Sequence, residues 1–383
     1  MRALSVLGAT GSIGASTLDL VRRQPGAWRI AALTANCQAA ELAALARESA
    51  AEIAVVADEA CLPALREALA GSGIAAAGGA AALIEAAQRP ADLTVAAIVG
   101  CAGLAPTMAA IEQGRTVALA NKEALVSAGG VMIDACARHG TTLLPADSEH
   151  NAIFQCLAGN DLADVRSITL TASGGPFRDW TAAQLAEATP AQAVKHPNWA
   201  MGAKISVDSA TMFNKGLELI EAHHLFPVGL DKLRIIIHPQ SVVHSMVEYR
   251  DGSTLAQLGP SDMRVPIAAC LAWPGRMDTP CAPLDLAALG VLTFRAPDEA
   301  RFPATAMCRA AAEAGGAAPA VLNAANEIAV AAFLRGQIAF TRIAVMVAEV
   351  LSRYDAATPA SLDDVIAVDH AARVHARELL ELA

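Results

Sequence analysis

The chain has 383 residues, of which 54% are hydrophobic and 17% charged, and its formal net charge at pH 7 is −10. So apolar a composition excludes a disordered protein, and the acidic balance argues against nucleic-acid binding, which needs a basic surface. At about 150 residues per domain, the length predicts two or three domains.

The mean hydropathy of +0.40 raises the question of a membrane span. The longest uncharged stretch, Leu93–Ile111, has the length of a spanning helix. However, Gly100, Gly103 and Pro106 interrupt it where a strand would turn into a helix. We therefore expect no membrane contact.

The cysteines and the N-terminus point to a cytoplasmic protein. The eight cysteines contain no CxxC pair, which argues against a zinc site and against a disulfide framework. The N-terminal run has one arginine and meets Gly8 too early for a signal peptide.

Short apolar runs alternate with alanine-rich helical segments along the first 145 residues. This alternation predicts parallel βαβ units in a doubly wound, Rossmann-like sheet, and thus an α/β fold. The expected strands are Leu4–Leu7, Ile30–Leu33, Ile53–Ala57, Leu93–Val99, Thr116–Ala120 and Thr141–Leu144.

A glycine-rich turn follows the first of these strands. The run Gly8-Ala-Thr-Gly11-Ser-Ile-Gly14 precedes a helical pattern at Ser16–Arg23. Glycines there allow backbone N–H groups to approach a pyrophosphate at a helix N-terminus, so we expect a nucleotide site rather than a merely structural turn.

The end of the second strand bears on the choice of coenzyme. The residues Thr34-Ala35-Asn36-Cys37-Gln38 contain no acid that would bind a ribose 2′-hydroxyl, which favours NADP over NAD. They also contain no arginine or lysine that would bind a 2′-phosphate.

The sequence pattern changes after residue 145, which indicates further domains. We expect a nucleotide-binding domain over residues 1–145 and an α+β catalytic and metal-binding domain over 146–283. A linker over 284–303, which includes the proline-rich segment Pro297–Pro303, would join these to a C-terminal helical domain over 304–383, where alanine, leucine and glutamate recur at helical spacing.

Two short segments follow predicted strands, where sheets of this class place their ligands. Asn121-Lys122-Glu123 is the first, although Lys122 taken alone could be a surface charge. In the second, Asp147-Ser148-Glu149, an extended backbone would put both carboxylates on one side. A Mg²⁺ or Mn²⁺ ion between them would relieve their repulsion; the competing interpretation is a helix N-cap.

A third, longer segment contains donors suited to a phosphate. Residues 195–204 include Trp199 and suit a mobile lid, unless that tryptophan is structural. Ser209, Asn214 and Lys215 then offer hydroxyl, amide and ammonium donors. Glu218 is either a third metal carboxylate or part of a solvated helix face.

Other polar groups are more ambiguous. Ser173-Gly174-Gly175-Pro176 offers another flexible donor turn. His238 and His244 flank an apolar strand, so we expect them to be core or surface residues rather than ligands.

Taken together, the motifs resemble one known family, the 1-deoxy-D-xylulose 5-phosphate reductoisomerases. The strings that carry the resemblance run in order from Gly8 to Leu334: GATGSIG, ALANKEALV, LLPADSEHNAIFQ, SGGPFR, KHPNWAMGAKISVDSATMFNKGLELIEA, HPQSVVHSMVEY and VLNAANEIAVAAFL. The resemblance implies a homodimeric enzyme of the non-mevalonate isoprenoid pathway that depends on NADPH and on Mg²⁺ or Mn²⁺. Its small-molecule substrate, a ketose phosphate, would be rearranged and reduced to 2-C-methyl-D-erythritol 4-phosphate.

The resemblance also implies a role for each matching residue. The metal ligands would be Asp147, Glu149 and Glu218. The substrate contacts would be Lys122, Ser148, Glu149, Ser173, His196, Ser209, Asn214, Lys215 and Glu218, with Lys122, Glu149, His196 and Glu218 catalytic. The coenzyme contacts would be Thr10, Gly11, Ser12, Ile13, Asn36, Asn121, Glu123 and Gly202.

One position departs from the family pattern. Many members have a basic residue where this chain has Cys37, so the strength of NADP selectivity is open.

Two rival functions fit parts of the same sequence. A metal-independent NAD(P)-dependent sugar or semialdehyde dehydrogenase would need the glycine turn but no metal. A non-catalytic sugar-phosphate sensor would bind ligand without oxidising NADPH, and the three acids argue against it.

Overall fold

The computed structural model describes residues 1–199, 201–354 and 357–381, and their contacts divide into two compact units. The first unit comprises Met1–Ala124, Met132–Asn151 and Met263–Cys281. The second comprises Leu125–Val131, Ala152–Asp262 and Ala282–Ala383.

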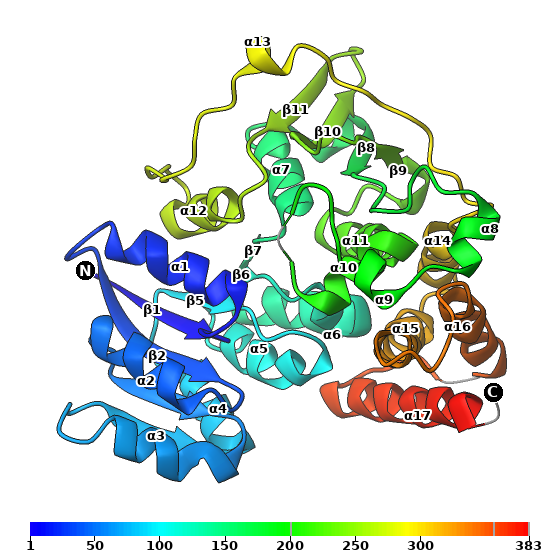
Figure 1. Cartoon of the computed structure of the whole chain (residues 1–383). Coiled ribbons are helices and arrows are strands. Elements are labelled where there is room, and N and C mark those ends of the chain that lie inside the picture. Colours follow the sequence, from blue (N-terminus) through cyan, green and yellow to red (C-terminus); the bar gives the residue numbers. More distant parts are fainter. Residues whose placement is uncertain (200, 355–356, 382–383) are drawn as a thin grey trace. The chain divides into compact units, whose positions relative to one another are not determined.

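The first unit is built on a seven-stranded parallel sheet in the order β4-β3-β2-β1-β5-β6-β7, of which β1, β2, β5, β6 and β7 are labelled in Figure 1. The order reverses between β1 and β5, and this is the position where doubly wound sheets bind ligands. The strands are β1 Arg2–Leu7, β2 Trp28–Ala35, β3 Ile53–Val56, β4 Ala75–Gly78, β5 Leu93–Ala96, β6 Thr116–Leu119 and β7 Thr142–Pro145.

Helices connect these strands, as parallel pairing requires. They are α1 Ser12–Arg22, α2 Ala39–Glu48, α3 Leu62–Ala68, α4 Ala80–Gln88, α5 Leu104–Ile111 and α6 Lys122–His139. The helix α7, Ser148–Leu157, follows β7, and α12, Arg264–Ala272, packs against α1.

The second unit contains a four-stranded sheet in the order β11-β10-β8-β9. Its strands are β8 Val165–Ala172, β9 Leu233–Ile237, β10 Val243–Tyr249 and β11 Thr254–Leu258. β8 and β9 are parallel, whereas β10 is antiparallel to both β8 and β11. β11 is therefore an edge strand.

The helices of the second unit carry its larger core. They are α8 Ala182–Ala186, α9 Pro190–Ala193, α10 Ala203–Thr211, α11 Phe213–Leu225, α13 Leu286–Leu289, α14 Ala304–Ala314, α15 Ala318–Leu334, α16 Arg342–Arg353 and α17 Leu362–Glu381. Single 3₁₀ turns occur at Glu59–Cys61, Cys101–Gly103, Leu162–Asp164 and Leu230–Lys232.

The helix α15 lies at the centre of this core. It packs against α14, α16 and α17 (Figure 1), and most of its residues are buried because it is apolar on nearly every face. Phe177, Phe213 and Phe333 fill the same hydrophobic cluster, so the C-terminal helices and the segments that carry site residues share one core.

The observed elements confirm the predicted α/β alternation and correct it in two places. The strand β4, Ala75–Gly78, was not predicted, because alanine and glycine have low strand propensity. The predicted strand Leu93–Val99 ends at Ala96, so the uncharged stretch to Ile111 divides into β5, a turn and α5.

Among the described residues, none of the helices combines the length and the apolar character that crossing a membrane requires. All eight cysteines lie in the described part of the chain and are free thiols.

Candidate active site

A glycine turn joins β1 to α1, and two of its glycines are required by the packing. Gly8 has a φ of 89°, and a Cβ there would lie 2.7 Å from the carbonyl oxygen of Ala97. A Cβ on Gly14 would lie 2.5 Å from the Cα of Ala9. The backbone is therefore packed too closely at these points for any side chain.

The helix α1 begins without a side-chain cap. Its N-cap residue is Gly11, and the predicted coenzyme contacts Thr10, Gly11, Ser12 and Ile13 are all exposed or partly exposed. Backbone N–H groups at an uncapped helix start are suited to bind a phosphate. The turn thus has the geometry of a pyrophosphate site.

The end of β2 lies beside this turn. The Thr10 hydroxyl donates to Gln38 Oε1 at 3.5 Å, and both Asn36 and Cys37 are exposed just beyond the strand. The backbone N of Cys37 also donates to Gln38 Oε1, at 3.3 Å.

Two other predicted coenzyme contacts are buried at the start of α6. Asn121, 1% exposed, donates through Nδ2 to the carbonyl oxygen of Gly100 at 2.9 Å and accepts through Oδ1 from the backbone N of Ala124 at 3.1 Å. The Asn121 side chain therefore caps α6 and holds the loop that follows β5. Glu123 is 7% exposed.

The predicted site residues Lys122, Ser148 and Glu149 lie around Asp147 in the first unit, together with His150, which was not predicted. Lys122 Nζ lies 3.0 Å from Asp147 Oδ2, and His150 Nδ1 lies 3.2 Å from Oδ1. Ser148 Oγ donates to Glu149 Oε2 at 2.6 Å. Because Lys122 is only 7% exposed, its interpretation as a surface charge is wrong.

The backbone around Asp147 differs from the prediction. Instead of an extended run over Asp147–Glu149, α7 begins at Ser148. Asp147 Oδ1 accepts from the backbone N of Glu149 at 3.1 Å, as an N-cap residue does. One carboxylate therefore both caps α7 and pairs with Lys122, so the N-cap and the ligand interpretations are compatible.

In the second unit, Ser173 and His196 form a hydrogen-bonded pair. Burial lowers the pKa of His196 to about 4, so its ring is neutral near pH 7. Nδ1 accepts from the backbone N of Asn198 at 3.2 Å and of Trp199 at 3.0 Å. The ring proton is therefore on Nε2, which donates to Ser173 Oγ at 2.9 Å.

The Ser173 hydroxyl is consequently oriented as a donor. Its oxygen accepts from His196 and also from the backbone N of Gly175 at 3.1 Å. With both lone pairs used, the hydroxyl proton is left for an acceptor such as a phosphate oxygen.

The predicted lid, residues 195–204, contains Ala200, which lies outside the described residues. Before that point, Asn198 Nδ2 donates to the carbonyl oxygen of Pro239 at 2.6 Å and to Ser241 Oγ at 3.1 Å. The first half of the segment is thus attached to the loop between β9 and β10.

Trp199 and Gly202 lie on either side of Ala200. The partly exposed Trp199 ring lies 6.1 Å from the ring of His244. Gly202 is exposed and is the N-cap of α10.

Three residues of α11 place their polar groups together, and Ser209 on α10 is half-buried. Asn214 Nδ2 donates to Glu218 Oε1 at 2.6 Å, and Lys215 Nζ bonds to Glu218 Oε2. Their spacing of three and four residues puts them on one helix face. Because Glu218 is 1% exposed and Lys215 is 3% exposed, the interpretation of Glu218 as a solvated residue is wrong.

Asp208 is a buried acid to which the sequence pattern assigned no role. Its Oδ2 pairs with Lys204 Nζ at 2.8 Å, and its Oδ1 accepts from Asn326 Nδ2 on α15 at 2.8 Å. These contacts join α10 to the C-terminal helices. The i,i+4 spacing of Lys204 and Asp208 was the available signal, whereas the contact with Asn326 depends on the fold.

His238 and His244 are buried, at 0% and 4% exposure, as expected of core residues. His238 Nδ1 bonds to the carbonyl oxygen of Thr293 at 2.9 Å, and its Nε2 accepts from the backbone N of Val242 at 3.3 Å. Both ring nitrogens of His238 therefore have structural partners.

Family models match three segments that together cover most of the chain. Models described as 1-deoxy-D-xylulose 5-phosphate reductoisomerase, its C-terminal domain, and the DXP reductoisomerase C-terminal domain match residues 4–129, 143–226 and 258–375, respectively.

Individual relatives match the chain along almost its whole length. A 1-deoxy-D-xylulose 5-phosphate reductoisomerase from Zymomonas mobilis is 59% identical over 380 residues, which cover 99% of this chain and 98% of the relative. One from Cereibacter sphaeroides is 53% identical over 385 residues, which cover 99% and 98%.

Solved structures agree in fold. The Zymomonas mobilis enzyme in complex with NADPH has a TM-score of 0.95 at 58% identity, with 99% of each chain covered. A DOX-P reductoisomerase in complex with NADPH, fosmidomycin and magnesium has a TM-score of 0.94 at 44% identity, with 100% of this chain and 99% of that chain covered. The predicted fold class is thereby confirmed.

Proposed function

The chain belongs to the 1-deoxy-D-xylulose 5-phosphate reductoisomerase family, and on this premise we propose the reaction that it performs. It rearranges and reduces 1-deoxy-D-xylulose 5-phosphate to 2-C-methyl-D-erythritol 4-phosphate in non-mevalonate isoprenoid precursor biosynthesis. NADPH and Mg²⁺ or Mn²⁺ are its cofactors. The observation that carries this proposal is the 59% identity to a named relative along 99% of the chain.

We assign the metal ion to Asp147, Glu149 and Glu218. Carboxylate oxygens are the ligands that Mg²⁺ and Mn²⁺ prefer. Two of the three acids already pair with a cation of their own unit, Asp147 with Lys122 and Glu218 with Lys215, which supports their suitability for a positive ion. When bound, the metal supplies Lewis-acid stabilisation of negative charge on substrate oxygens.

We assign the coenzyme to the glycine turn and the edge of the parallel sheet. The uncapped start of α1, with Thr10, Gly11, Ser12 and Ile13, would bind the pyrophosphate. NADPH supplies the hydride for the reduction. The further coenzyme contacts that we propose are Asn36, Asn121, Glu123 and Gly202.

We assign the substrate phosphate to donors of the second unit. The oriented Ser173 hydroxyl, Ser209, Asn214 and Lys215 offer neutral and charged donors to phosphate oxygens. Held in this way, a flexible sugar phosphate loses rotational freedom before reaction.

The remaining proposed substrate contacts act nearer the reacting carbons. They are Lys122, Ser148, Glu149, His196 and Glu218, and all of these except Ser148 are proposed as catalytic. Lys122 supplies an ammonium donor, and the neutral His196 holds the Ser173 hydroxyl in its donor orientation through Nε2. The segment 195–204 would close over the site and exclude water.

The two rival functions are not favoured. This chain is 59% identical to a reductoisomerase along 99% of its length, and a solved relative is in complex with NADPH, fosmidomycin and magnesium. A metal-independent dehydrogenase would explain neither finding, and nor would a sugar-phosphate sensor.

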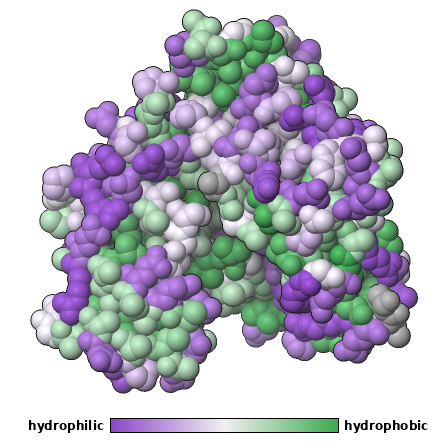
Figure 2. All heavy atoms as spheres, in the orientation of Figure 1, coloured by the Kyte–Doolittle hydropathy of each residue, from purple (hydrophilic) through white to green (hydrophobic). Residues whose placement is uncertain are grey.

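We further infer a homodimer formed through the sheet of the second unit. The edge strand β11 presents unpaired backbone groups. Exposed apolar side chains gather on it and on the segment that contains α13: Leu255, Leu258, Leu286, Val291, Leu292 and Phe294. Figure 2 shows hydrophobic residues over this part of the surface, at the top of the view. Such a surface is typical of an interface.

We also infer a cytoplasmic location and the domain roles expected from the sequence. The free state of all eight cysteines supports a reducing compartment. Residues 1–145 would bind NADPH, 146–283 would hold the metal and substrate, 284–303 would link, and 304–383 would form the helical domain.

The proposal is tested by following the loss of NADPH absorbance with 1-deoxy-D-xylulose 5-phosphate. We expect oxidation with Mg²⁺ or Mn²⁺ and none after EDTA treatment. Oxidation that persists in EDTA would favour a dehydrogenase, and binding without oxidation under either condition would favour a sensor.

A further inference from the structure

A cavity lies in the first unit, at the amino edge of the parallel sheet. It has a volume of about 630 Å³ and is lined by residues that open β1 and β2, by the turn after α1, and by the end of α12 with the segment beyond it. Arg2 is the first residue of β1, whereas the glycine turn follows the last residue of that strand. At ~3.3 Å per residue, the two ends of this six-residue strand lie about 17 Å apart. The cavity is therefore separate from the proposed coenzyme site.

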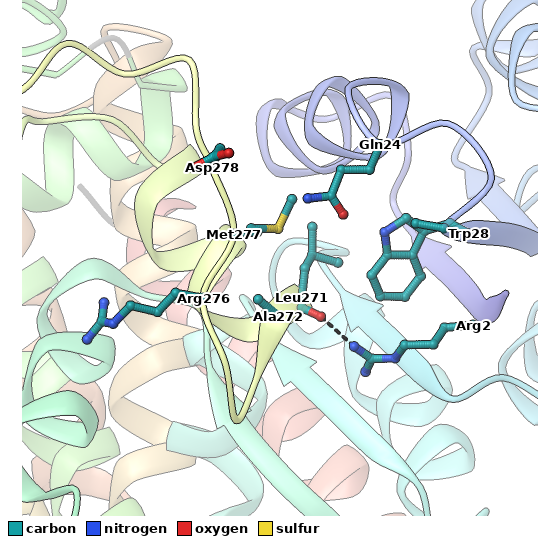
Figure 3. Close-up of a pocket in the computed structure, with 9 residues that line it drawn as sticks. Arg2, Gln24, Trp28, Leu271, Ala272, Arg276, Met277 and Asp278 are labelled. Atoms are coloured by element: carbon teal, nitrogen blue, oxygen red, sulfur yellow. Dashed lines mark hydrogen bonds between the residues drawn. The ribbon is translucent and has the colours of Figure 1, made fainter.

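Hydrogen-bond donors line one side of the cavity. Trp28 Nε1 is buried and has no acceptor among the residues that the structure describes. Figure 3 shows the side chain of Gln24 reaching over the cavity from the turn after α1, with its amide nitrogen directed away from Trp28. The guanidinium of Arg2 donates through Nη1 to the carbonyl oxygen of Leu271 at 2.7 Å, which leaves its other N–H groups for a further acceptor.

An apolar surface lies beside these donors. The Trp28 ring, Leu271 and Met277 face the same space (Figure 3). The Arg2 guanidinium carbon lies 4.8 Å from the centroid of the Trp28 ring, so positive charge is held directly against the aromatic surface.

The charges of the cavity favour a monoanion. The lining residues carry two arginines, Arg2 and Arg276, and one acid, Asp278. Arg276 and Asp278 are exposed, and their opposite charges offset each other at the rim. In the inner part of the cavity, the Arg2 guanidinium therefore has no acidic partner among the lining residues.

We propose that this cavity binds a small aromatic carboxylate. The carboxylate accepts from Arg2 and from the Gln24 amide and Trp28 Nε1–H, and the ring packs on Trp28, Leu271 and Met277. A guanidinium recognises a carboxylate through two parallel hydrogen bonds, and the volume lies within the range of roughly 300–1,000 Å³ of small-molecule sites. This binding is additional to the proposed reaction and does not depend on it.

The test observes the indole N–H of Trp28 by ¹H–¹⁵N NMR of the full-length protein, with benzoate as the probe. The Trp28 signal is identified as the one of the four tryptophan signals that is lost in Trp28→Phe. Benzamide, which has the same shape without the charge, is the control ligand. We expect a saturable shift of this signal with benzoate and none with benzamide.

Two variants locate the anion. Arg2→Met should weaken benzoate binding at least ten-fold while NADPH binding is unchanged. Because Arg2 lies in a strand, Gln24→Ala, in a turn, provides a second variant if the first does not fold, and it should also weaken binding. The proposal is overturned by an absent shift, by an equal response to benzamide, or by unchanged benzoate affinity in both variants. Affinity that falls in Gln24→Ala but is unchanged in Arg2→Met would also overturn the proposal, and would place the probe in a smaller cavity, which Gln24 and Trp28 line as well and Arg2 does not.

Discussion

Replacing Glu218 with glutamine distinguishes the role of its charge in catalysis from its role in folding. The carboxylate accepts from Asn214 and Lys215 and is 1% exposed. Glutamine keeps the size and one acceptor oxygen but removes the negative charge. Lys215, itself 3% exposed, then loses this counter-charge in a buried position.

The structure sets the size of the effect on stability. Removing one partner of a buried ion pair costs about 3–5 kcal/mol. Since the glutamine oxygen still accepts a hydrogen bond, we expect a loss of about 3 kcal/mol in the free energy of unfolding. The double variant Lys215→Met with Glu218→Gln removes both charges and should recover most of that loss.

The effect on turnover should be different. Both variants lack a proposed metal ligand, and losing several kcal/mol of charge stabilisation corresponds to a fall in kcat of about 1,000-fold or more. NADPH binding should be unchanged in both, because neither Glu218 nor Lys215 is among the proposed coenzyme contacts.

Three measurements check this reasoning: urea unfolding, calorimetric titration with NADPH, and NADPH consumption with substrate and Mg²⁺. Full activity in Glu218→Gln would refute the metal assignment. A double variant as unstable as the single one would refute the electrostatic account of the pair.

Three further predictions concern the coenzyme turn and the neutral histidine. Gly14→Ala should weaken NADPH binding in a calorimetric titration, because its Cβ would lie 2.5 Å from backbone atoms; Gly130→Ala, with no atom within 4 Å, is the control, and equal affinities would contradict the packing argument. Cys37→Arg should raise the preference for NADPH over NADH about ten-fold through a charge-assisted contact with the 2′-phosphate, and an unchanged ratio of their kcat/KM values would show that this position does not face the phosphate. Because the pKa of His196 is lowered from 6.5 to about 4 in the folded state, the unfolded state binds the proton more tightly, and stability is lost as pH falls through this window. With allowance for partial exposure, urea unfolding should show that His196→Asn removes about 1 kcal/mol of the difference between pH 7 and pH 4, and the same pH dependence in both proteins would contradict the neutral assignment.

Local sequence rules predicted those parts of the fold and site that depend on short spacing. The alternation of apolar strands and helices predicted the parallel sheet, and the glycine turn followed directly from the β1–α1 junction. Asn214, Lys215 and Glu218 share one helix face because helical spacing places residues three and four apart together.

Features that depend on long-range packing were not predictable in this way. β4 contains three alanines and a glycine and becomes a strand through pairing with β3, so its propensity gave no signal. Ser173 and His196 are 23 residues apart, and no spacing rule joins them. At Asp147 the local residues fitted both an extended run and a helix N-cap, and only the structure shows that α7 begins at Ser148.

The most direct test of the proposed reaction is the structure of its product, determined by proton NMR. Rearrangement with reduction gives a branched product whose methyl group is on a carbon without hydrogen, so its signal is a singlet. Reduction without rearrangement would give an unbranched alcohol whose methyl signal is a doublet. We predict a singlet, formed in step with NADPH oxidation and only with the metal; a doublet, or product formation in EDTA, would contradict the account.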